Sequence, residues 1–587
     1  MARARVVADA SGAWRAMLPS RPAGGPYVLS ARAAGGTESI ISDVHLGDVY
    51  LCSGQSNMEF PARSANNGAG AGDDGVRLFK APLESALQPK AMFSKPAHWS
   101  LAQGEDLNEF SAVCFFFARE IKDAAKAPIG LIQSAWGGTR IESWISDAGL
   151  RSVDGFDAAL DELANAVTDP VGARARFEAG LVQWWMKNDP GARAGWGGFE
   201  FDDSKWPRVT LDGGSWENSD APALAEFDGA VWFRTEFNLT KEQAAHRAEL
   251  TLGPIDDIDV TFLNGAVIGG ESGWQSPRTY QVPAGTLRPG RNTLAVGVLD
   301  TIGGGGLWGE PETRTVRFAD GSAVAIGVNW RYKISAGLWD LPPPPPRAPW
   351  DGQDAYTGLY NAMISPLAPF GLRGVLWYQG ESNVASPDEY ARLLPALMRD
   401  WRKAFEAPHL PFLIVQLANF GAPAMKPQPH SWGGLREAQR RAVAADANAG
   451  LAVTIDIGDR FDIHPTQKSI VAQRLARIAR RLIYGEEIVD IGPTPVATKR
   501  AGDAVIIDFD HGPLVTYSAA RPIAFELCDT DRDCRFADAA IDGSRVKIDA
   551  RGSTPAFVRY CWEDAPICNL YNDSDLPAVP FEAPIEH

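Results

Sequence analysis

Hydrophobic positions follow two different patterns along this chain of 587 residues. In residues 46–178 and again in 339–486, short apolar runs alternate with stretches in which apolar residues recur every three or four positions. Continuous apolar runs predict buried strands and the second pattern predicts amphipathic helices, so both segments indicate one α/β sheet. The predicted strands lie in "VYLC", "IGLIQSA", "GVLWY", "FLIV" and "GLAV".

The segment between them, residues 179–338, changes to alternating apolar and polar residues, as in "AVWFRTEFNL" and "DIDVTFLNG". Short alternating strands separated by Gly and Asp turns predict an antiparallel β-sandwich inserted into the α/β domain. The run Pro342–Pro346 predicts a stiff polyproline linker that leads back to the sheet. Residues 1–45 and 487–587 predict small flanking β regions.

Composition narrows the classes of partner. The formal net charge of −17 disfavours nucleic acid, whose binders concentrate Lys and Arg. No apolar run reaches the roughly 18 residues of a membrane span, and the first 14 residues lack the apolar core of a secretion signal. A neutral ligand fits better.

The six cysteines fall into two groups. Cys528 and Cys534 lie close together, as do Cys561 and Cys568, whereas Cys52 and Cys114 stand alone. The close spacings favour two disulfide-closed hairpins; free thiols and a zinc site are the alternatives, but zinc favours C-x2-C spacing with neighbouring His. Disulfides would imply a periplasmic or secreted protein.

Ser56, in "GQSNM", directly follows a predicted strand. A serine becomes nucleophilic only when a base can take its proton and N–H donors await the oxyanion. His464 is the candidate base, because it follows a strand and precedes a helix predicted to begin at Pro465. Asp462 is the candidate acid that orients the imidazole, with Asp459 as the second candidate.

Two further polar groups follow predicted strands. Gly137 and Gly138 end the second strand, and "WYQGESN" ends the third. An isolated Gly-Gly is most simply a tight turn. Because the carboxyl ends of parallel strands meet at one edge of a sheet, however, these groups are expected to converge on Ser56.

Five motifs occur in order: "CSGQSNM", "GGTRIESW", "LYNAMISPLAPFGLRGVLWYQGESN", "LREAQ" and "DIHPTQK". Together they resemble the sialate O-acetylesterase-like branch of the SGNH hydrolases, which includes carbohydrate acetylesterases. The resemblance implies a three-layer α/β/α hydrolase domain without metal or organic cofactor. It also implies Ser56 as nucleophile, His464 as base, and an oxyanion hole from Ser56, Gly138 and Gln379.

The chain departs from the superfamily pattern at two positions. Phe461 stands three residues before His464, where the superfamily has its triad Asp, and Ser382 stands where it has an Asn. Arg140, Glu142 and Trp144 are expected to lie behind the site or to line it. The residues expected to bind substrate are Gln55, Asn57, Gly137, Arg140, Glu381 and Asn383.

The insert is similar to the galactose-binding-like jelly-roll domains of many glycosidases. Such domains either bind sugar or only pack beside the active site, and a structural or rim-forming role is expected ahead of independent binding. Esterases with such an insert resemble those that deacetylate plant hemicellulose, so acetylated xylan or xyloglucan fragments are expected ahead of O-acetyl sialic acid. A sialate O-acetylesterase is the first alternative. A carbohydrate-binding protein on an inactive esterase scaffold is the alternative from another class.

Overall fold

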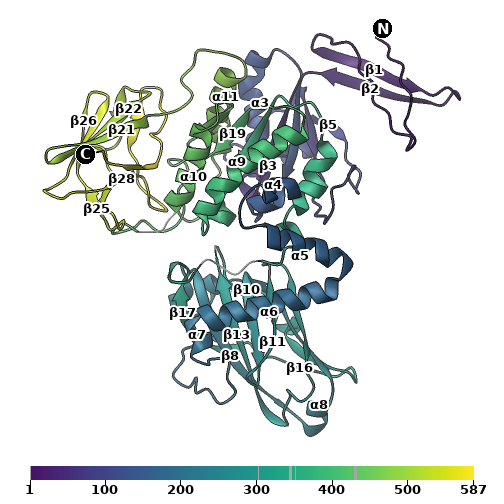
Figure 1. Cartoon of the computed structure of the whole chain (residues 1–587), viewed down its shortest axis with the longest axis vertical. Coiled ribbons are helices and arrows are strands. Elements are labelled where there is room, and N and C mark those ends of the chain that lie inside the picture. The colour runs from purple at the N-terminus through teal and green to yellow at the C-terminus, as the bar shows by residue number, and fades with distance from the viewer. Residues whose placement is uncertain (1, 302, 343–346, 351, 429–431, 587) are drawn as a thin grey trace.

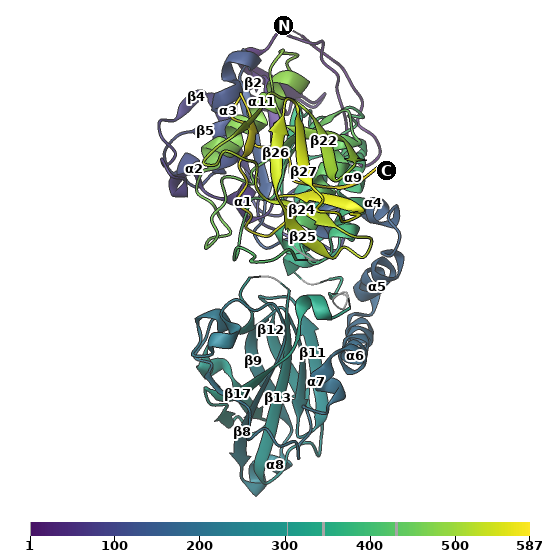
Figure 2. The same cartoon turned by 90° about the vertical axis from the view of Figure 1, so that its left-hand side faces the viewer.

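The computed structural model describes residues 2–301, 303–342, 347–350, 352–428 and 432–586. A central α/β domain carries an N-terminal hairpin on one side and a C-terminal β domain on the other, and the inserted sandwich lies beneath it (Figure 1). Figure 2, turned by 90°, shows the same separation of the sandwich from the rest. Most of the predicted polyproline linker lies outside the described residues, and the predicted domain boundaries stay predictions.

The central sheet has seven strands in the order β20-β19-β18-β3-β6-β4-β5, all parallel except the β4–β5 pair. The first half of the domain supplies β3, β6, β4 and β5. The second half supplies β18, β19 and β20, which lie on the other side of β3. The sheet is therefore split in sequence, as predicted. Its strands are β3 (Asp48–Gly54), β4 (Asp73–Lys80), β5 (Trp99–Ala102), β6 (Ile129–Ala135), β18 (Gly374–Tyr378), β19 (Phe412–Val415) and β20 (Ala449–Ala452).

Helices cover both faces of this sheet. Tyr50 and Cys52 of β3 join the hydrophobic core on the face of α3 and α11, whereas Leu51 between them joins the core on the face of α9 and α10. These helices are α3 (Ala112–Ala125), α9 (Pro387–Ala404), α10 (Trp432–Ala444) and α11 (Lys468–Leu482). The predicted three-layer α/β/α domain is confirmed.

Helix α11 corrects one predicted boundary. It begins at Lys468 with Gln467 as its N-cap, whereas the sequence placed its start at Pro465. Residues 465–467 instead form a turn in which the Lys468 N–H bonds the carbonyl of Thr466. Because the helix begins later than predicted, His464 lies in the loop that precedes it, at the edge of the sheet.

The inserted domain is an antiparallel β-sandwich. Its first sheet has the order β11-β10-β13-β8-β17-β7 and its second β12-β9-β15-β16, with β14 paired to β9. The strands are β7 (Arg208–Thr210), β8 (Gly229–Leu239), β9 (Ala248–Asp256), β10 (Ile258–Leu263), β11 (Ala266–Ser272), β12 (Pro277–Val282), β13 (Gly290–Asp300), β14 (Gly306–Leu307), β15 (Thr315–Phe318), β16 (Ala323–Ala325) and β17 (Asn329–Gly337).

Further helices complete the α/β domain and join it to the sandwich, where α6 lies along the sheet that contains β11 (Figures 1 and 2). Their bounds are α1 (Ser56–Glu59), α2 (Gly104–Asn108), α4 (Asp147–Arg151), α5 (Asp157–Thr168), α6 (Pro170–Asn188), α7 (Pro190–Arg193) and α8 (Lys241–Ala245). No helix among the described residues is long and apolar enough to span a membrane.

The flanking regions are all β. At the N-terminus β1 (Gly24–Arg32) pairs with β2 (Glu38–Leu46). The C-terminal domain contains the sheets β21-β22-β27-β26, β25-β24-β28-β30 and β23-β29. Its strands are β21 (Thr494–Ala501), β22 (Ala504–Asp510), β23 (Leu514–Thr516), β24 (Phe525–Cys528), β25 (Cys534–Ala537), β26 (Ala539–Asp542), β27 (Arg545–Asp549), β28 (Phe557–Tyr560), β29 (Leu570–Asn572) and β30 (Phe581–Pro584).

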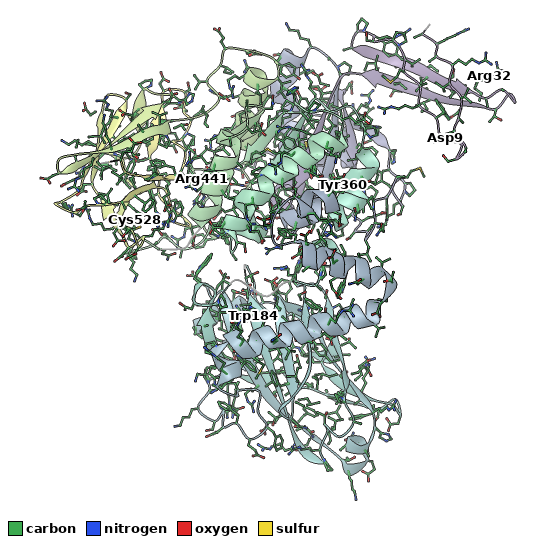
Figure 3. The ribbon with its side chains drawn as sticks, viewed as in Figure 1. Asp9, Arg32, Trp184, Tyr360, Arg441 and Cys528 are labelled. Carbon is green, nitrogen blue, oxygen red and sulfur yellow. A yellow bond between two sulfur atoms is a disulfide. The ribbon has the colours of Figure 1, made fainter. Side chains whose placement is uncertain are left out.

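All six cysteines form disulfides. Cys528–Cys534 closes the predicted hairpin between β24 and β25, and Figure 3 labels Cys528. Cys561–Cys568 also forms as predicted, but it closes a loop between β28 and β29, which pair with other strands, and not a hairpin. Glu526 lies near enough to Cys528 and Cys534 to share a metal ion, but the disulfide removes both thiolate ligands. The expectation that Cys52 and Cys114 stand alone is wrong: β3 and α3 pack together and bring these cysteines, 62 residues apart, into a third disulfide.

Candidate active site

Ser56 lies at the carboxyl end of β3, in the middle of the central sheet. The strand ends at Gly54, where φ is +137° and a Cβ atom would lie 2.0 Å from the carbonyl oxygen of Tyr378. Only glycine allows this close turn between neighbouring strands. Ser56 then begins the short helix α1, whose first N–H groups have no intrahelical acceptor and point out of the turn.

His464 reaches Ser56 from the loop between β20 and α11. Its Nε2 lies 2.8 Å from Ser56 Oγ, within hydrogen-bond distance. Burial lowers the pKa of His464, and the nearby Lys468 cation lowers it further, while Asp462 acts in the opposite direction. A neutral imidazole facing a serine hydroxyl is the arrangement that a general base requires.

Asp462 is the carboxylate nearest this imidazole. Its Oδ1 lies 3.5 Å from His464 Nδ1 and also accepts a hydrogen bond of 2.8 Å from the His464 backbone N–H. Asp459 instead accepts from the N–H of Phe461. Of the two candidates, the geometry therefore favours Asp462, although its side chain is 59% exposed and its contact with Nδ1 exceeds an ordinary hydrogen bond.

The turn Gly137–Gly138 follows β6, the neighbour of β3, and lies directly beside the serine. A Cβ atom on Gly137 would come 3.2 Å from Ser56 Cβ. The Gly137 N–H donates to Glu59 Oε2 at 2.7 Å, and its carbonyl accepts from Gln353 Nε2 at 3.2 Å. Gly138 has a φ of +73°, a conformation that turns the chain sharply at this point.

Gln379 does not point its amide at Ser56. Its Nε2 donates to the Thr139 carbonyl at 3.1 Å and to Asn383 Oδ1 at 2.8 Å, and the residue is fully buried. Both N–H groups of the side chain are thus engaged in joining the β18 loop to the β6 loop. This geometry argues against the predicted role of Gln379 as an oxyanion donor, because a hydrogen already donated within the fold is not free for the substrate.

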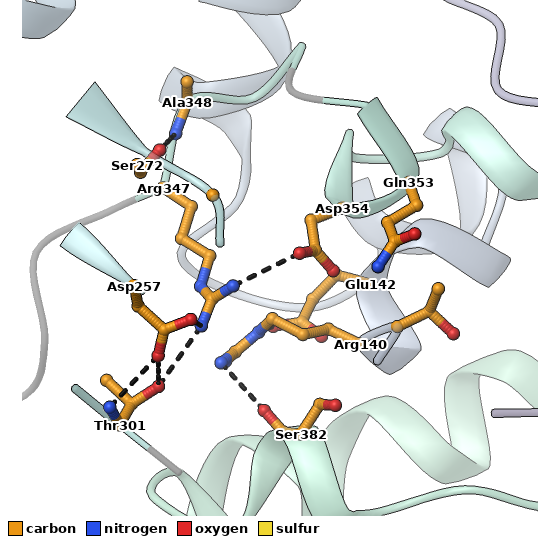
Figure 4. A network of polar contacts seen from close by, with 12 residues as sticks. Arg140, Glu142, Asp257, Ser272, Thr301, Arg347, Ala348, Gln353, Asp354 and Ser382 are labelled. Atoms are coloured by element: carbon orange, nitrogen blue, oxygen red, sulfur yellow. Dashed lines mark hydrogen bonds and ion pairs between the residues drawn. The ribbon is translucent and has the colours of Figure 1, made fainter. Parts of the chain in front are cut away.

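Other residues expected to bind substrate also lie beneath the site. Asn383 Nδ2 donates to Glu142 Oε2 at 2.8 Å, and its Oδ1 also accepts from the Ile141 N–H. Arg140 bonds Glu142 and the carbonyl of Ser382 (Figure 4). The fully buried Trp144 donates to Thr139. These contacts fit a supporting role for Arg140 and Asn383 better than the predicted contact with substrate, and they place Trp144 behind the site, which was one of its two expected positions.

A buried polar cluster lies below the catalytic pair. Asn57 Nδ2 donates to Glu381 Oε1 at 2.6 Å and to the carbonyl of Ile463 at 3.0 Å, while Lys468 Nζ donates to Asn57 Oδ1. Burial lowers the pKa of Lys468 to about 7 and raises that of Glu381. Asn57, the neighbour of Ser56 in the chain, is therefore hydrogen-bonded to Ile463, the neighbour of His464.

Gln55 is the remaining predicted contact. Its Oε1 accepts from the N–H groups of Gly380 at 3.2 Å and Ser382 at 3.4 Å, and the residue is 3% exposed. The side chain therefore holds the β18 loop against the serine turn.

The sequence interpretation missed four residues at the site: Glu59, Gln353, Lys468 and Trp274. Lys468 and Glu59 belong to or adjoin the motifs "DIHPTQK" and "GQSNM", so their position in those motifs was the available signal. Gln353 and Trp274 had no such signal, because their place depends on how the insert meets the α/β domain.

Several known proteins are similar to this chain. A family described as "Carbohydrate esterase, sialic acid-specific acetylesterase" matches residues 46–176 and 347–480. The chain is similar to a sialate O-acetylesterase of Mus musculus, at 23% identity over all of this chain and 87% of the relative. A sialate O-acetylesterase of Pongo abelii is 31% identical over 40% of this chain and 50% of that protein.

A solved structure is similar over nearly the whole length. It is described as a novel carbohydrate acetylesterase from Xanthomonas citri, with a TM-score of 0.61 and 26% identity over 98% of this chain and 90% of that one. Both the split α/β domain and the chain around it therefore have known relatives.

Proposed function

We propose that this protein uses Ser56 to remove O-acetyl groups from plant cell-wall oligosaccharides. The carbohydrate esterase model matches both halves of its α/β domain, and the chain is similar over its whole length to acetylesterases, so the protein is an acetylesterase. The observation that carries the proposal is the 2.8 Å contact between His464 Nε2 and Ser56 Oγ. A base with a lowered pKa thus lies within hydrogen-bond distance of the Ser56 hydroxyl.

In the first half of the reaction Ser56 Oγ attacks the acetyl carbonyl carbon while His464 Nε2 takes its proton. The tetrahedral intermediate carries an oxyanion. His464 then gives its proton to the sugar oxygen as the C–O bond breaks, so that the sugar leaves as an alcohol and Ser56 is acetylated. Asp462 favours the imidazolium that exists between the two proton transfers.

In the second half, His464 takes a proton from water as the water oxygen attacks the acetyl-serine. Collapse of this second intermediate breaks the bond to Ser56 Oγ, which recovers its proton from His464, and acetate departs. The nucleophile and base return to their starting states, and no external oxidant or reductant takes part.

The oxyanion donors in this proposal are the backbone N–H groups of Ser56 and Gly138. The first lies at the start of α1 and the second in the sharp turn after β6, both at the carboxyl edge of the sheet. Gln379, with both of its N–H groups engaged, holds the loops that form this edge.

The substitution Ser56→Ala tests the nucleophile. We expect hydrolysis of nitrophenyl acetate to fall at least about 10⁴-fold, because the attacking oxygen is gone. Ser322→Ala, which removes an exposed hydroxyl from a turn of the insert, is the matched control and should keep wild-type turnover. Undiminished turnover by Ser56→Ala would remove the basis of the proposal.

Two classes of substrate follow from different observations. The insert and its aromatic residues favour xylan- or xyloglucan-type fragments, whereas the similarity to sialic acid-specific acetylesterases and to the mammalian relatives favours O-acetyl sialic acid. Acetate release from acetylated xylan, acetylated xyloglucan fragments and O-acetyl sialic acid, compared at equal concentration, separates them. Fastest release from sialic acid would replace the plant substrate with the alternative.

We also place the protein in the periplasm or outside the cell. Three disulfides are stable in an oxidising compartment and are rare in a reducing one. Titration of thiols in protein isolated from its natural host under alkylating conditions tests this: six free thiols would contradict it.

A further inference from the structure

A tryptophan of the inserted sandwich lies next to the oxyanion turn. Trp274 is carried by the turn between β11 and β12, and a Cβ atom added to Gly138 would come 3.3 Å from its Nε1 and 3.4 Å from its Cζ2. Gly137, the preceding residue, lies just as near to Ser56. Two consecutive glycines therefore separate the nucleophile from an indole that belongs to another domain.

The turn that carries Trp274 is firmly supported. Arg278 is fully buried. One of its terminal nitrogens, Nη1, donates to the carbonyls of Gly273, at 2.6 Å, and Ser276, at 2.5 Å, which lie on either side of the tryptophan. Its Nε bonds Asp259 Oδ1 at 2.8 Å, and the Tyr280 hydroxyl donates to the same carboxylate. A buried ion pair that also satisfies backbone carbonyls fixes the turn before any ligand arrives.

The insert is also fixed to the α/β domain close to this turn. Arg347, on the segment that leaves the insert, lies 3.4 Å from Asp257 and bonds Thr301 of the sandwich, and it lies 3.2 Å from Asp354 of the α/β domain (Figure 4). The N–H of Ala348 donates to Ser272, the last residue of β11. The position of Trp274 beside Gly138 thus rests on a set of directed contacts.

Trp274 is not used to build a core. It is partly exposed, and its ring packs edge-on against the partly exposed Trp308 of the same domain, with centroids 5.7 Å apart. Neither tryptophan belongs to the hydrophobic clusters of the described residues, whereas Trp232, Trp216 and Trp330 of the sandwich do. A large aromatic ring is thus left partly exposed near the nucleophile.

We propose that Trp274, backed by Trp308, is a platform for a neutral sugar ring and so determines which acetylated glycans the site accepts. The inference rests on the proposed esterase function and names its substrate more closely. An indole offers a flat apolar face to the C–H face of a pyranose and an N–H donor to a sugar hydroxyl. A sugar stacked there lies one glycine turn from Ser56, so an acetyl group on that ring or on its neighbour reaches the nucleophile.

The charges around the platform favour a neutral sugar over an acidic one. The guanidinium groups of Arg140 and Arg347 in Figure 4 are already paired, the first with Glu142 and the second with Asp257 and Asp354. A sialic acid carboxylate would find these two cations occupied by buried carboxylates. The platform therefore favours xylose- or glucose-based chains.

The test measures selectivity. For Trp274→Ala we expect KM for an acetylated xylo-oligosaccharide to rise about tenfold, because stacking on the ring is lost, and the ratio of kcat/KM on this substrate to kcat/KM on nitrophenyl acetate to fall by a similar factor. Trp274→Phe should recover part of the ratio. Trp99→Ala is the control, since Trp99 is also partly exposed but lies against Gly130, near the opposite end of β6.

A binding measurement separates this inference from the esterase function. Calorimetry on the Ser56→Ala protein with an unacetylated xylo-oligosaccharide should show heat of binding that the further change Trp274→Ala removes. If Ser56→Ala keeps wild-type turnover, the nucleophile proposal fails whatever the calorimetry shows. The platform would be overturned if Trp274→Ala left the selectivity ratio and the binding unaltered, or if it lowered kcat/KM equally on both substrates. It would also be overturned if the ratio of kcat/KM on O-acetyl sialic acid to kcat/KM on nitrophenyl acetate fell just as far.

Discussion

Ser56 and His464 lie within hydrogen-bond distance, yet the segments that carry them are built differently. Around the serine, Cys52, Asn57 and Met58 are at most 2% exposed, and β3 is paired on both sides. In the histidine loop Phe461 is 82% exposed and the side chain of Asp462 is 59% exposed. The nucleophile is positioned by the sheet, whereas the base is positioned by a partly exposed loop.

This difference predicts which substitutions affect the stability of the protein and which affect the rate of its reaction. A sheet strand cannot move without breaking its ladder and its core, so the serine turn is fixed by the fold as a whole. The loop that carries His464 is held by the hydrogen bond from Asn57 to the carbonyl of Ile463, and helix α11 follows it in the chain. Changes in the residues that support Ser56 are therefore expected to act on stability, and changes on the histidine side on rate and on its pH dependence.

The largest expected effect follows from removing the base. His464→Ala should lower kcat about 10⁴-fold, the upper part of the range for general acid–base catalysis, with little change in melting temperature. Steady-state kinetics together with a thermal melt measure both. His511→Ala, in an exposed turn of the C-terminal domain, is the control. A loss below tenfold would show that another group takes the proton from Ser56.

The serine side is tested by its disulfide. Replacing both Cys52 and Cys114 by Ala opens a link between residues 62 apart, which costs about 4 kcal/mol of the free energy of unfolding in the chain-entropy estimate. Replacing Cys528 and Cys534, six residues apart, should cost about 2 kcal/mol. Urea unfolding compares the two variants. Equal costs would contradict a special role for the link that joins β3 to α3.

The cluster that tethers the two sides gives a prediction about pH. The Lys468 cation contributes to lowering the pKa of His464, and Lys468, with a pKa of about 7, is charged in the acidic range. Lys468→Met removes that cation, so the pKa of His464 rises and activity is lost at a higher pH as the solution is acidified. We also expect kcat at the optimum to fall about tenfold, because Asn57 loses a partner.

The profile of kcat/KM against pH provides the readout, and Lys468→Arg is the matched variant because it keeps the charge. An acid limb that moves to lower pH in Lys468→Met, or moves equally in Lys468→Arg, would contradict the electrostatic link. A merely structural role for Lys468 would lower the rate at every pH and leave the acid limb where it is.

The smallest expected effect is at the triad acid. Asp462→Asn should lower kcat only about tenfold, because the carboxylate is exposed and lies 3.5 Å from Nδ1, so water screens much of its attraction. Since Asp462 favours the charged imidazole, its loss should also lower the pKa of His464 and extend activity toward acidic pH. Asp459→Asn, which does not contact the imidazole, should match the wild type. A larger loss for Asp459→Asn would reassign the acid.

The sequence predicted this site as far as local motifs reach. Ser56 and His464 follow buried strands within recognisable motifs, and the order of the strands brings them to one edge. The start of α11 was placed too early, since Pro465 can begin a helix but here belongs to the turn before Lys468. Local sequence preference predicts the existence of such a helix more reliably than it predicts the first residue of the helix.

Long-range contacts explain what the sequence did not reveal. The bond between Lys468 and Asn57 joins residues 411 apart, and the Cys52–Cys114 disulfide depends on how α3 packs on β3. The engagement of Gln379 depends on Thr139, which is 240 residues away in the chain and on another loop. No periodicity within a segment carries this information, because each contact is decided only when distant elements pack together.

The central claim is that Ser56, activated by His464, is the nucleophile. A fluorophosphonate that reacts only with activated serines tests it directly, with peptide mapping by mass spectrometry after labelling of the full-length protein. We expect one label per chain, on the peptide that contains Ser56, lost in Ser56→Ala and slowed about 10⁴-fold in His464→Ala. A label on another residue, or rapid labelling of Ser56 in His464→Ala, would contradict the account.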